Sequence, residues 1–308
     1  MLDRLSKMSY LSGMNKLPLE KRIQIIKCLV EGNSLRSTSR LTDVAFNTVL
    51  KLLPQIGSAC EEFHNETVVN VKSQRVQADE IWSYVGSKEK NTSIEKKEEG
   101  CGDVWTWTAL DADSKLIVSW FVGERDAVAA IYFMHDVSLR LANRVQLTTD
   151  GHHAYLDAVD NAFQLDIDYA TLIKLYGPPT GESQTERKYS PNECNGTKTK
   201  VVSGEPNPKF ISTSYVERQN LTMRMHMRRF TRLTNAFSKK LENHCHAIAL
   251  HFVYYNFVRI HKSLSVTPAM QAGLTKKPMT IEDIAKLMDK ASSVPPKRGP
   301  YKKKENSK

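Results

Sequence analysis

Hydrophobic residues recur at helical spacing in the first part of the chain. The spacing of three and four positions that marks one helical face is shared by Leu19, Ile23, Ile26, Leu29 and Val30. Gly32 and Asn33 end this pattern, and shorter helical patterns follow at 34–40 and at about 45–53, before Pro54. Two short helices joined by a tight turn behind a longer helix predict a helix-turn-helix within residues 1–57.

The pattern changes to strand-like segments in the middle of the chain. Residues 58–72 predict a connecting helix and an entry strand, and segments rich in β-formers follow around 75–85 and on both sides of a turn at 111–114. A helix, a strand ending at Asp150, a second helix and a last strand at 167–176 come next. This succession predicts an α/β domain over residues 58–275.

Residues 177–212 interrupt this regular succession. The segment is punctuated by proline and glycine, so we expect either a lid or hairpin over the site or a disordered spacer. A long helical pattern then begins at Ser214 and is interrupted near Thr234 and Asn235. Residues 276–308 predict a short amphipathic helix at 281–290, which we expect to dock on the main domain, and a basic, disordered tail.

Composition adds a basic balance and no sign of a membrane span. The chain has 308 residues, 40% of them hydrophobic, and a net charge of +10. A polyanionic partner is therefore plausible, although half of this excess lies in residues 296–308. The five cysteines lack CxxC spacing, and no apolar run has the length of a transmembrane helix. We expect a cytoplasmic protein with free thiols.

Three carboxylates lie on separate predicted elements that can converge on a divalent cation. Asp79 stands among apolar residues in mid-strand, where a charge is expensive without a cation or partner, Asp150 ends a strand, and Glu217 opens the long helix. At 100° per residue, one helical face carries Glu217, Asn220, Leu221, Arg224 and Arg228. This face places a carboxylate at the head of a basic stripe, which suits a metal ion beside a phosphate backbone.

Other candidate ligands have simpler explanations. Asp111 and Asp113 are rival metal ligands by residue type, but turn chemistry accounts for both. His152 and His153 could bind a metal, contact a phosphate or cap the following helix, and the last two are preferred. The run from His244 to His246 resembles a ligand set, yet residues two apart on a helix point in different directions.

Four motifs in this order resemble the DDE transposases of bacterial insertion sequences, relatives of retroviral integrases. They are ADEIW at 78–82, TTDGHHAY at 148–155, SYVERQN at 214–220 and YNFVRIHKSLSVTPA at 255–269. The resemblance implies an RNase H-like mixed sheet flanked by helices. It also implies two Mg²⁺ or Mn²⁺ ions held by Asp79, Asp150 and Glu217, with Arg224 on the substrate phosphate. Glu217 follows Asp150 at a longer spacing than is typical of the family, hence the insertion.

The expected partners are the terminal inverted repeats of a mobile element and the target DNA, bound by a nucleoid-associated homo-oligomer. The helix-turn-helix would read the element ends, and the candidate DNA contacts are Arg36, Ser39, Arg40, Asn47, Thr48, Lys51, His153 and Arg228. A helical dimerisation bundle is the alternative for residues 1–57. For the whole chain, the alternatives are a DNA-binding regulator derived from a transposase and a structure-selective nuclease.

Overall fold

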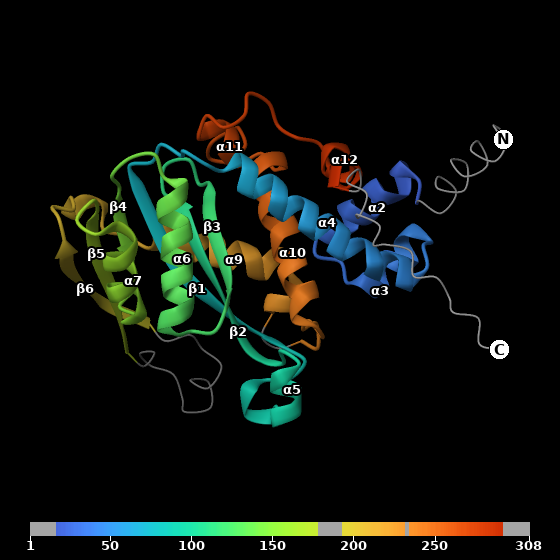
Figure 1. The fold of residues 1–308 in the computed structure, drawn as a ribbon, viewed down its shortest axis with the longest axis horizontal. Coiled ribbons are helices and arrows are strands. Elements are labelled where there is room, and N and C mark those ends of the chain that lie inside the picture. The colour runs from blue at the N-terminus through green and yellow to red at the C-terminus, as the bar shows by residue number, and fades with distance from the viewer. Residues whose placement is uncertain (1–16, 178–192, 232–233, 292–308) are drawn as a thin grey trace, which may run out of the picture.

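Six strands form one mixed sheet in the computed structural model of the chain, in the order β3-β2-β1-β4-β5-β6 (Figure 1). The structure describes residues 17–177, 193–231 and 234–291. The expected basic tail at 296–308 and residues 178–192 of the expected insertion lie outside the described residues.

The sheet combines antiparallel and parallel pairs. β1 (Arg75–Val85), β2 (Gly102–Asp111) and β3 (Ile117–Gly123) are antiparallel neighbours. β4 (Gln146–Thr149) and β5 (Asp168–Gly177) continue the sheet parallel to β1, and β6 (Glu193–Ser203) returns antiparallel beside β5. This mixed sheet is compatible with the RNase H-like fold that the resemblance implies.

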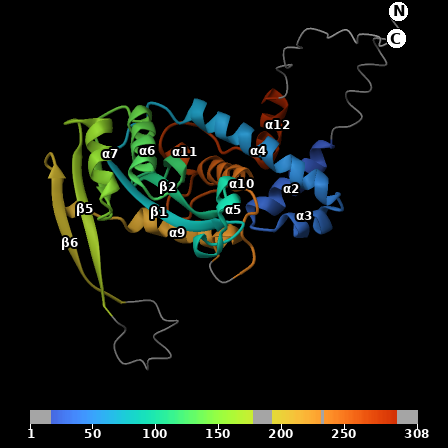
Figure 2. The ribbon, with the colours of Figure 1, turned by 60° about the horizontal axis from the view of Figure 1, so that its bottom comes forward.

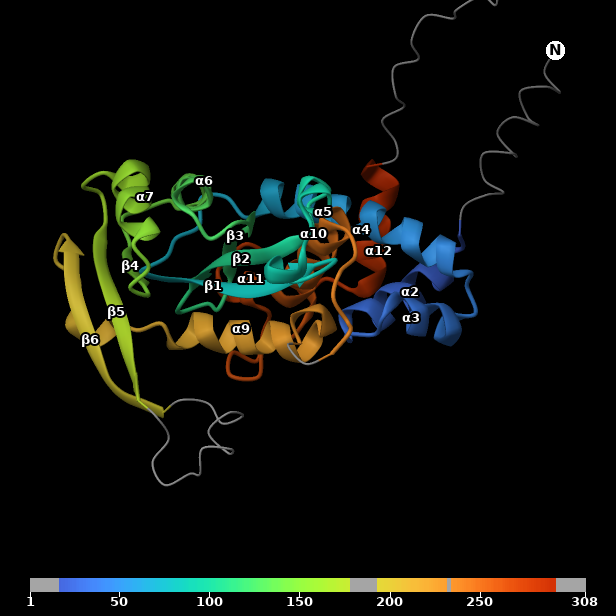
Figure 3. The ribbon, with the colours of Figure 1, turned by 90° about the horizontal axis from the view of Figure 1, so that it is seen from below.

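Helices cover both faces of the sheet because the side chains of β1 alternate between two hydrophobic clusters. Val76 and Ala78 pack with α6 (Ala127–Arg140) and α7 (Ala154–Phe163), whereas Ile81 packs with α9 (Ser214–His226) and α10 (Leu241–Val253). Seen from below in Figure 3, α6 and α7 lie on one side of the sheet and α9 lies on the other. Residues of β1 with odd and even numbers therefore reach different layers.

The N-terminal helices share a hydrophobic core with the C-terminal part of the chain. α2 (Leu19–Val30), α3 (Leu35–Thr42) and α4 (Phe46–Thr67) begin the described chain, and Ser34 caps α3 by accepting a hydrogen bond from the Ser37 amide at 3.0 Å. Buried residues of α2 and α4 form one cluster with residues of α10 and of α12 (Ile281–Ala291). The core thus crosses the expected boundary at residue 57.

The predicted end of the third helix near Pro54 is wrong, because α4 continues through this proline to Thr67. A proline inside a helix costs about 3 kcal/mol, since it removes one backbone hydrogen bond and crowds the preceding turn. Val49, Leu53, Ile56 and Cys60 are fully or almost fully buried on α4. Burying such side chains contributes about 1.5–3 kcal/mol each, which offsets the cost of Pro54.

A further expectation, about the last strand of the sheet, needs correction. The strand at 168–177 is not the last one, because residues 193–203 of the expected insertion pair with it as β6 (Figure 2). Residues 193–203 lack an alternating pattern of apolar and polar residues strong enough to predict this edge strand. α12 packs on α2 and α4 within the core that also contains α10, and Arg22 binds Asp289 at 2.9 Å there.

Short elements complete the described chain. They are η1 (Glu89–Asn91), α5 (Ile94–Glu98), η2 (Pro208–Phe210), η3 (Arg228–Phe230), the π-helical turn η4 (Tyr254–Val258) and α11 (Pro268–Gln271). The expected interruption of the long helix is present, since α9 ends at His226 and α10 begins at Leu241. Within the described ranges, the search for a helix able to span a membrane finds none.

Candidate active site

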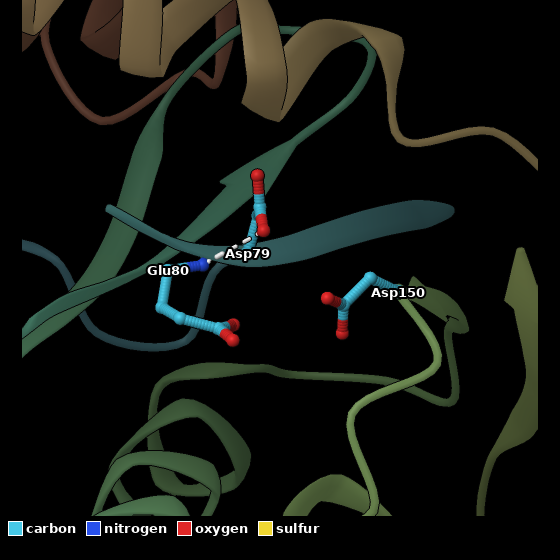
Figure 4. A group of neighbouring side chains, drawn as sticks. All are labelled: Asp79, Glu80 and Asp150. Carbon is cyan, nitrogen blue, oxygen red and sulfur yellow. Dashed lines mark hydrogen bonds between the residues drawn. The ribbon is translucent and has the colours of Figure 1, made fainter. Parts of the chain in front are cut away.

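Parallel pairing of β1 and β4 brings two of the predicted carboxylates together. Gln77 of β1 lies opposite Thr148 of β4. Continuing this register by two positions sets Asp79 beside Asp150, where β4 has already ended. Figure 4 shows Asp79 on β1 and Asp150 on the segment that follows β4, with the carboxylate of Asp150 directed toward that of Glu80. The pairing of β1 with β4 therefore places the carboxylates of Asp79 and Asp150 next to each other at the centre of the site.

Asp79 is held between its own strand and α9. Its Oδ1 accepts a hydrogen bond from the Glu80 amide at 2.9 Å, and its Oδ2 accepts one from Asn220 Nδ2 at 2.8 Å. Burial, followed by the charges of Glu80, Asp150 and Glu217, raises the pKa of Asp79 to about 8. Two acids side by side in a dry site favour a proton or a cation between them.

Glu80 is a further acid at the site that the sequence analysis did not select. Its Oε1 accepts a hydrogen bond from Arg125 Nε at 2.6 Å, and its Oε2 accepts one from the Tyr155 hydroxyl at 2.9 Å. One carboxylate oxygen from each of Asp79, Glu80 and Asp150 lies within 4.8 Å of the other two. Side chains alternate along a strand, so Glu80 points to the face of the sheet opposite Asp79. Glu80 nevertheless has the same apolar neighbours in the sequence as Asp79, and the cost of burying its charge could have identified it.

Arg125 ties two of these acids together. It reaches the site from the connection between β3 and α6, where its guanidinium also lies 3.8 Å from Asp150 Oδ2. Burial and the charge of Asp150 raise the pKa of Glu80, while the Arg125 guanidinium lowers it. The cation thus partly balances a cluster of like charges.

Glu217 approaches the site from the first turn of α9. Its Oε1 accepts a hydrogen bond from Thr213 Oγ1 at 2.6 Å, and its Oε2 pairs with Lys174 of β5. Glu217 is not part of the cluster formed by Asp79, Glu80 and Asp150. Its charge nevertheless contributes to the raised pKa of Asp79, so it lies close enough for the two groups to interact.

A single cavity of about 830 Å³ joins these groups. Its lining includes the predicted residues Asp79, Asp150, His153, Glu217 and Arg224. Arg228 lies elsewhere, because α9 ends at His226 and the helical face that started at Glu217 does not continue to it. The prediction that Arg228 shares this face is wrong.

The expected DNA contacts of the helix-turn-helix lie apart from this cavity. Arg36 and Arg40 are exposed on α3, and Asn47 and Lys51 are exposed at the start of α4, where Thr48 is half-buried. Each pair is spaced by four residues, so each occupies one side of its helix. Ser39 is instead half-buried, and its hydroxyl donates to the Val44 carbonyl at 2.7 Å.

The rival ligands are engaged in local structure. Asp111 accepts hydrogen bonds from Ser73 Oγ at 2.8 Å and from the Ser114 amide at 3.1 Å, as expected for a turn residue. Asp113 pairs with Arg75. His153 occupies the N-cap position of α7 without a side-chain capping bond, so the structure does not support its suggested capping role.

The imidazoles of the remaining histidine candidates His152, His244 and His246 also have local environments, and His246 Nε2 lies 3.7 Å from Glu242 Oε1 on the same helix. His152 stacks on Trp107, with ring centroids 5.8 Å apart. His244 lies between Ser83 Oγ at 3.2 Å and Ser238 Oγ at 3.0 Å. The reading of His244 as an ordinary helix residue is therefore confirmed.

The donor set of the cavity fits a hard divalent cation. Carboxylate oxygens from Asp79, Asp150 and Glu217 are the ligands that Mg²⁺ and Mn²⁺ prefer. Asn220 lines the same cavity, and in the described part of the chain its buried Oδ1 meets no hydrogen-bond donor. An oxygen-rich cavity in which burial raises the pKa of Asp79 is a candidate for a functional site, and its donor set suits a metal ion.

Comparison with known proteins does not add to this picture. No protein-family model matches the chain, and no curated protein sequence matches it.

Proposed function

We propose that the chain is a metal-dependent transposase of the DDE type with an RNase H-like core. The observation that carries the proposal is the convergence of Asp79, Asp150 and Glu217 from separate elements on one cavity that also contains Arg224. The six-stranded mixed sheet and the four sequence motifs support it. The reaction would be cleavage and joining of DNA strands at the ends of a mobile element.

The carboxylates Asp79, Asp150 and Glu217 would hold Mg²⁺ or Mn²⁺. When bound, the metal supplies Lewis acidity that makes the attacking oxygen nucleophilic and stabilises charge on the leaving oxygen. The Arg224 guanidinium offers a bidentate fork to the substrate phosphate from α9. Lys174 and Arg125, from β5 and from the loop before α6, pair with Glu217 and Glu80 and so offset part of the negative charge that would oppose a polyanion in this cavity.

The experiment is a cleavage and joining assay on DNA that carries the inverted repeats bounding the gene. Asp79→Asn, Asp150→Asn and Glu217→Gln keep side-chain size and should each lower cleavage by about a hundredfold or more, since even outer-shell partners of a metal are worth 10–100-fold. Asp113→Asn is the matched control, because Asp113 lies outside the cavity and pairs with Arg75. Activity should require Mg²⁺ or Mn²⁺ and disappear with a chelator.

The products of this assay separate the proposal from its alternatives. Cleavage followed by joining supports a transposase, whereas cleavage without joining identifies a nuclease. Sequence-specific binding with no metal-dependent cleavage identifies a regulator. Full cleavage by any one of the three carboxylate variants removes that residue from the site.

A further inference from the structure

A row of aromatic rings leads away from the carboxylate cavity across one face of the sheet. The row consists of Trp105, Trp82, Tyr84 and Phe237, all half-buried. Trp82 and Trp105 are directly paired on β1 and β2, so their side chains share a face. Ring centroids are 5.7 Å apart between Trp82 and Tyr84, and 5.0 Å apart between Tyr84 and Phe237. A backbone hydrogen bond holds the segment of Phe237 beside that of Tyr84, because the Gly86 amide donates to the Ser238 carbonyl at 2.8 Å.

Cations accompany this row. Arg125, which binds Glu80 in the carboxylate cavity, also lies 4.9 Å from the Trp105 ring centroid. Lys88 lies 5.7 Å from the ring centroid of Trp82 and 5.9 Å from that of Tyr84. The one acid that β2 places opposite Tyr84 is Asp103, and its carboxylate accepts a hydrogen bond from the Glu89 amide. The row therefore starts at the candidate active site and has positive charge along it.

The far end of the row opens into a second cavity of about 730 Å³. This cavity lies between the N-terminal helices and the segment that joins α9 to α10, and Phe237 lines it. Its described lining contains no aspartate or glutamate, but it contains the cations Arg36, Arg228, Arg229, Lys239 and Lys240. The buried His251 also lines it, and in the described residues no hydrogen-bond partner reaches His251 Nε2.

Rings with flanking cations and an acid-free cavity match the chemistry of unpaired nucleotides. Bases stack on aromatic side chains whatever their sequence, and phosphates bind the neighbouring cations. The row runs along β1 from the side of Glu80, which lines the first cavity, to Tyr84, which contacts Phe237 of the second. Glu80 and Tyr84 are roughly 13 Å apart at the strand rise of about 3.3 Å per residue, a distance that a few nucleotides span.

We propose that the row Trp105, Trp82, Tyr84 and Phe237 binds a single-stranded segment of the DNA whose phosphodiester lies in the carboxylate cavity, and that the second cavity receives the end of this segment. This inference rests on the proposed function. In this proposal the single strand binds the face of the sheet that carries the aromatic row, and double-stranded DNA binds other surfaces of the protein.

The test is fluorescence anisotropy of a labelled oligothymidylate with the full chain, in a chelator so that no cleavage occurs. Tyr84→Leu and Phe237→Leu keep apolar bulk but remove the aromatic face, and each should weaken single-strand binding on the order of tenfold, as expected for one stacked base. Tyr132→Leu is the matched control, because Tyr132 is an exposed ring on α6 outside the row. Duplex DNA of random sequence is titrated in parallel.

A second pair of variants does not touch the aromatic packing. Lys88→Gln should weaken single-strand binding by a few-fold, whereas Lys90→Gln, an exposed neighbour on η1, should not. Wild-type-like single-strand binding in the Tyr84, Phe237 and Lys88 variants overturns the proposal. Equal losses for duplex and single strand also overturn it, since they indicate a general electrostatic or structural effect, as does a change in oligomeric state. Ring-dependent binding in a protein whose cleavage does not depend on Asp79 would instead count against the proposed function.

Discussion

Asp79 is a buried carboxyl surrounded by other acids, and this environment gives it an unusual titration. Its pKa rises from 3.8 to about 8, so the folded chain keeps this proton over a range in which the unfolded chain has lost it. The folded state binds more protons than the unfolded state in that window, and the free energy of unfolding therefore falls as the pH rises through it. The contribution is destabilising and is largest above about pH 8.

Asp79→Asn should accordingly stabilise the protein while removing a metal ligand. With a chelator present and above about pH 8, we expect the free energy of unfolding of this variant to exceed that of the wild type by about 1 kcal/mol or more. A difference of one pKa unit between the folded and unfolded states corresponds to 1.36 kcal/mol. The two proteins should converge near pH 4, close to the ordinary pKa of 3.8. Urea denaturation at several pH values measures this. Asp113→Asn, which removes a half-exposed carboxylate, is the control, and a constant difference at all pH values would contradict the titration of Asp79.

At the scale of single elements, α9 separates the two basic residues that sequence periodicity had placed together. Arg224 lies within the helix and lines the carboxylate cavity, whereas Arg228 lies beyond its end in η3. The period of the helix was predictable from the sequence, but its end was not. The Met227 backbone leaves the helical conformation, with φ at −127° and ψ at 98°.

Arg224→Ala should lower the cleavage rate at saturating DNA by about a hundredfold, the effect typical of losing one preorganised donor at a reacting centre. The loss should persist at every salt concentration, with a modest change in DNA affinity. Arg218→Ala is the matched control, because Arg218 is exposed on the same helix and does not line the cavity. Single-turnover kinetics would show equal rates for the two variants if Arg224 had no role beyond surface charge.

The continuity of α4 decides how the helix-turn-helix hypothesis can be tested. Deleting residues 18–57 would remove half of α4 and open the core that it shares with α10 and α12. Lost DNA binding in such a truncation would therefore report unfolding. Exposed side chains at the start of α4 offer a cleaner test.

Asn47→Ala should weaken binding to the element ends by about 1–3 kcal/mol and relax the sequence preference, as expected for loss of a bidentate contact to adenine. Lys51→Ala should instead weaken binding to all sequences alike. Glu62→Ala, exposed in the second half of the same helix, is the control. Competition binding with terminal and unrelated DNA measures the preference, and unchanged preference in both variants would favour the dimerisation bundle.

At the scale of the whole molecule, three buried histidines connect helices to the interior. His64 of α4 lies 3.3 Å from the Ile117 carbonyl through Nε2, while His244 and His251 belong to α10. Burial is the main cause that lowers the pKa of each to about 3. These groups bind protons in the unfolded chain below pH 6.5 but not in the folded chain until about pH 3, so stability falls as the pH drops through this range.

The protein should therefore unfold cooperatively in acid, well above pH 3. With three such groups, the free energy of unfolding should change by up to about 4 kcal/mol per pH unit within the window. His244→Asn keeps a polar group between Ser83 and Ser238 and should move the midpoint of acid unfolding to lower pH. Circular dichroism follows the transition, and His135→Asn, at an exposed position on α6, should leave the midpoint in place.

Local patterns in the sequence were sufficient for most elements and for the aspartates of the site. Asp79 was identified by its apolar neighbours in mid-strand, where a charge is costly to bury, and Asp150 by its position at the end of a strand. Contacts between distant segments were not predictable in this way. Pairing of Glu80 with Arg125 and Tyr155, the shared core of α4 with α12, and the edge pairing of β6 each join segments that no local period relates.

The unbroken course of α4 has one more consequence under the proposed function. α4 would carry the side chains that read the element ends at its start, and it packs against α10 further along. Its length would therefore set the distance between the recognised sequence and the cleaved phosphodiester. One residue inserted after Pro54 would rotate the reading half by about 100° and advance it by about 1.5 Å. The number of base pairs from recognition sequence to cleavage point would then be a mechanical property of this helix, set by its length and not by the chemistry of the carboxylates.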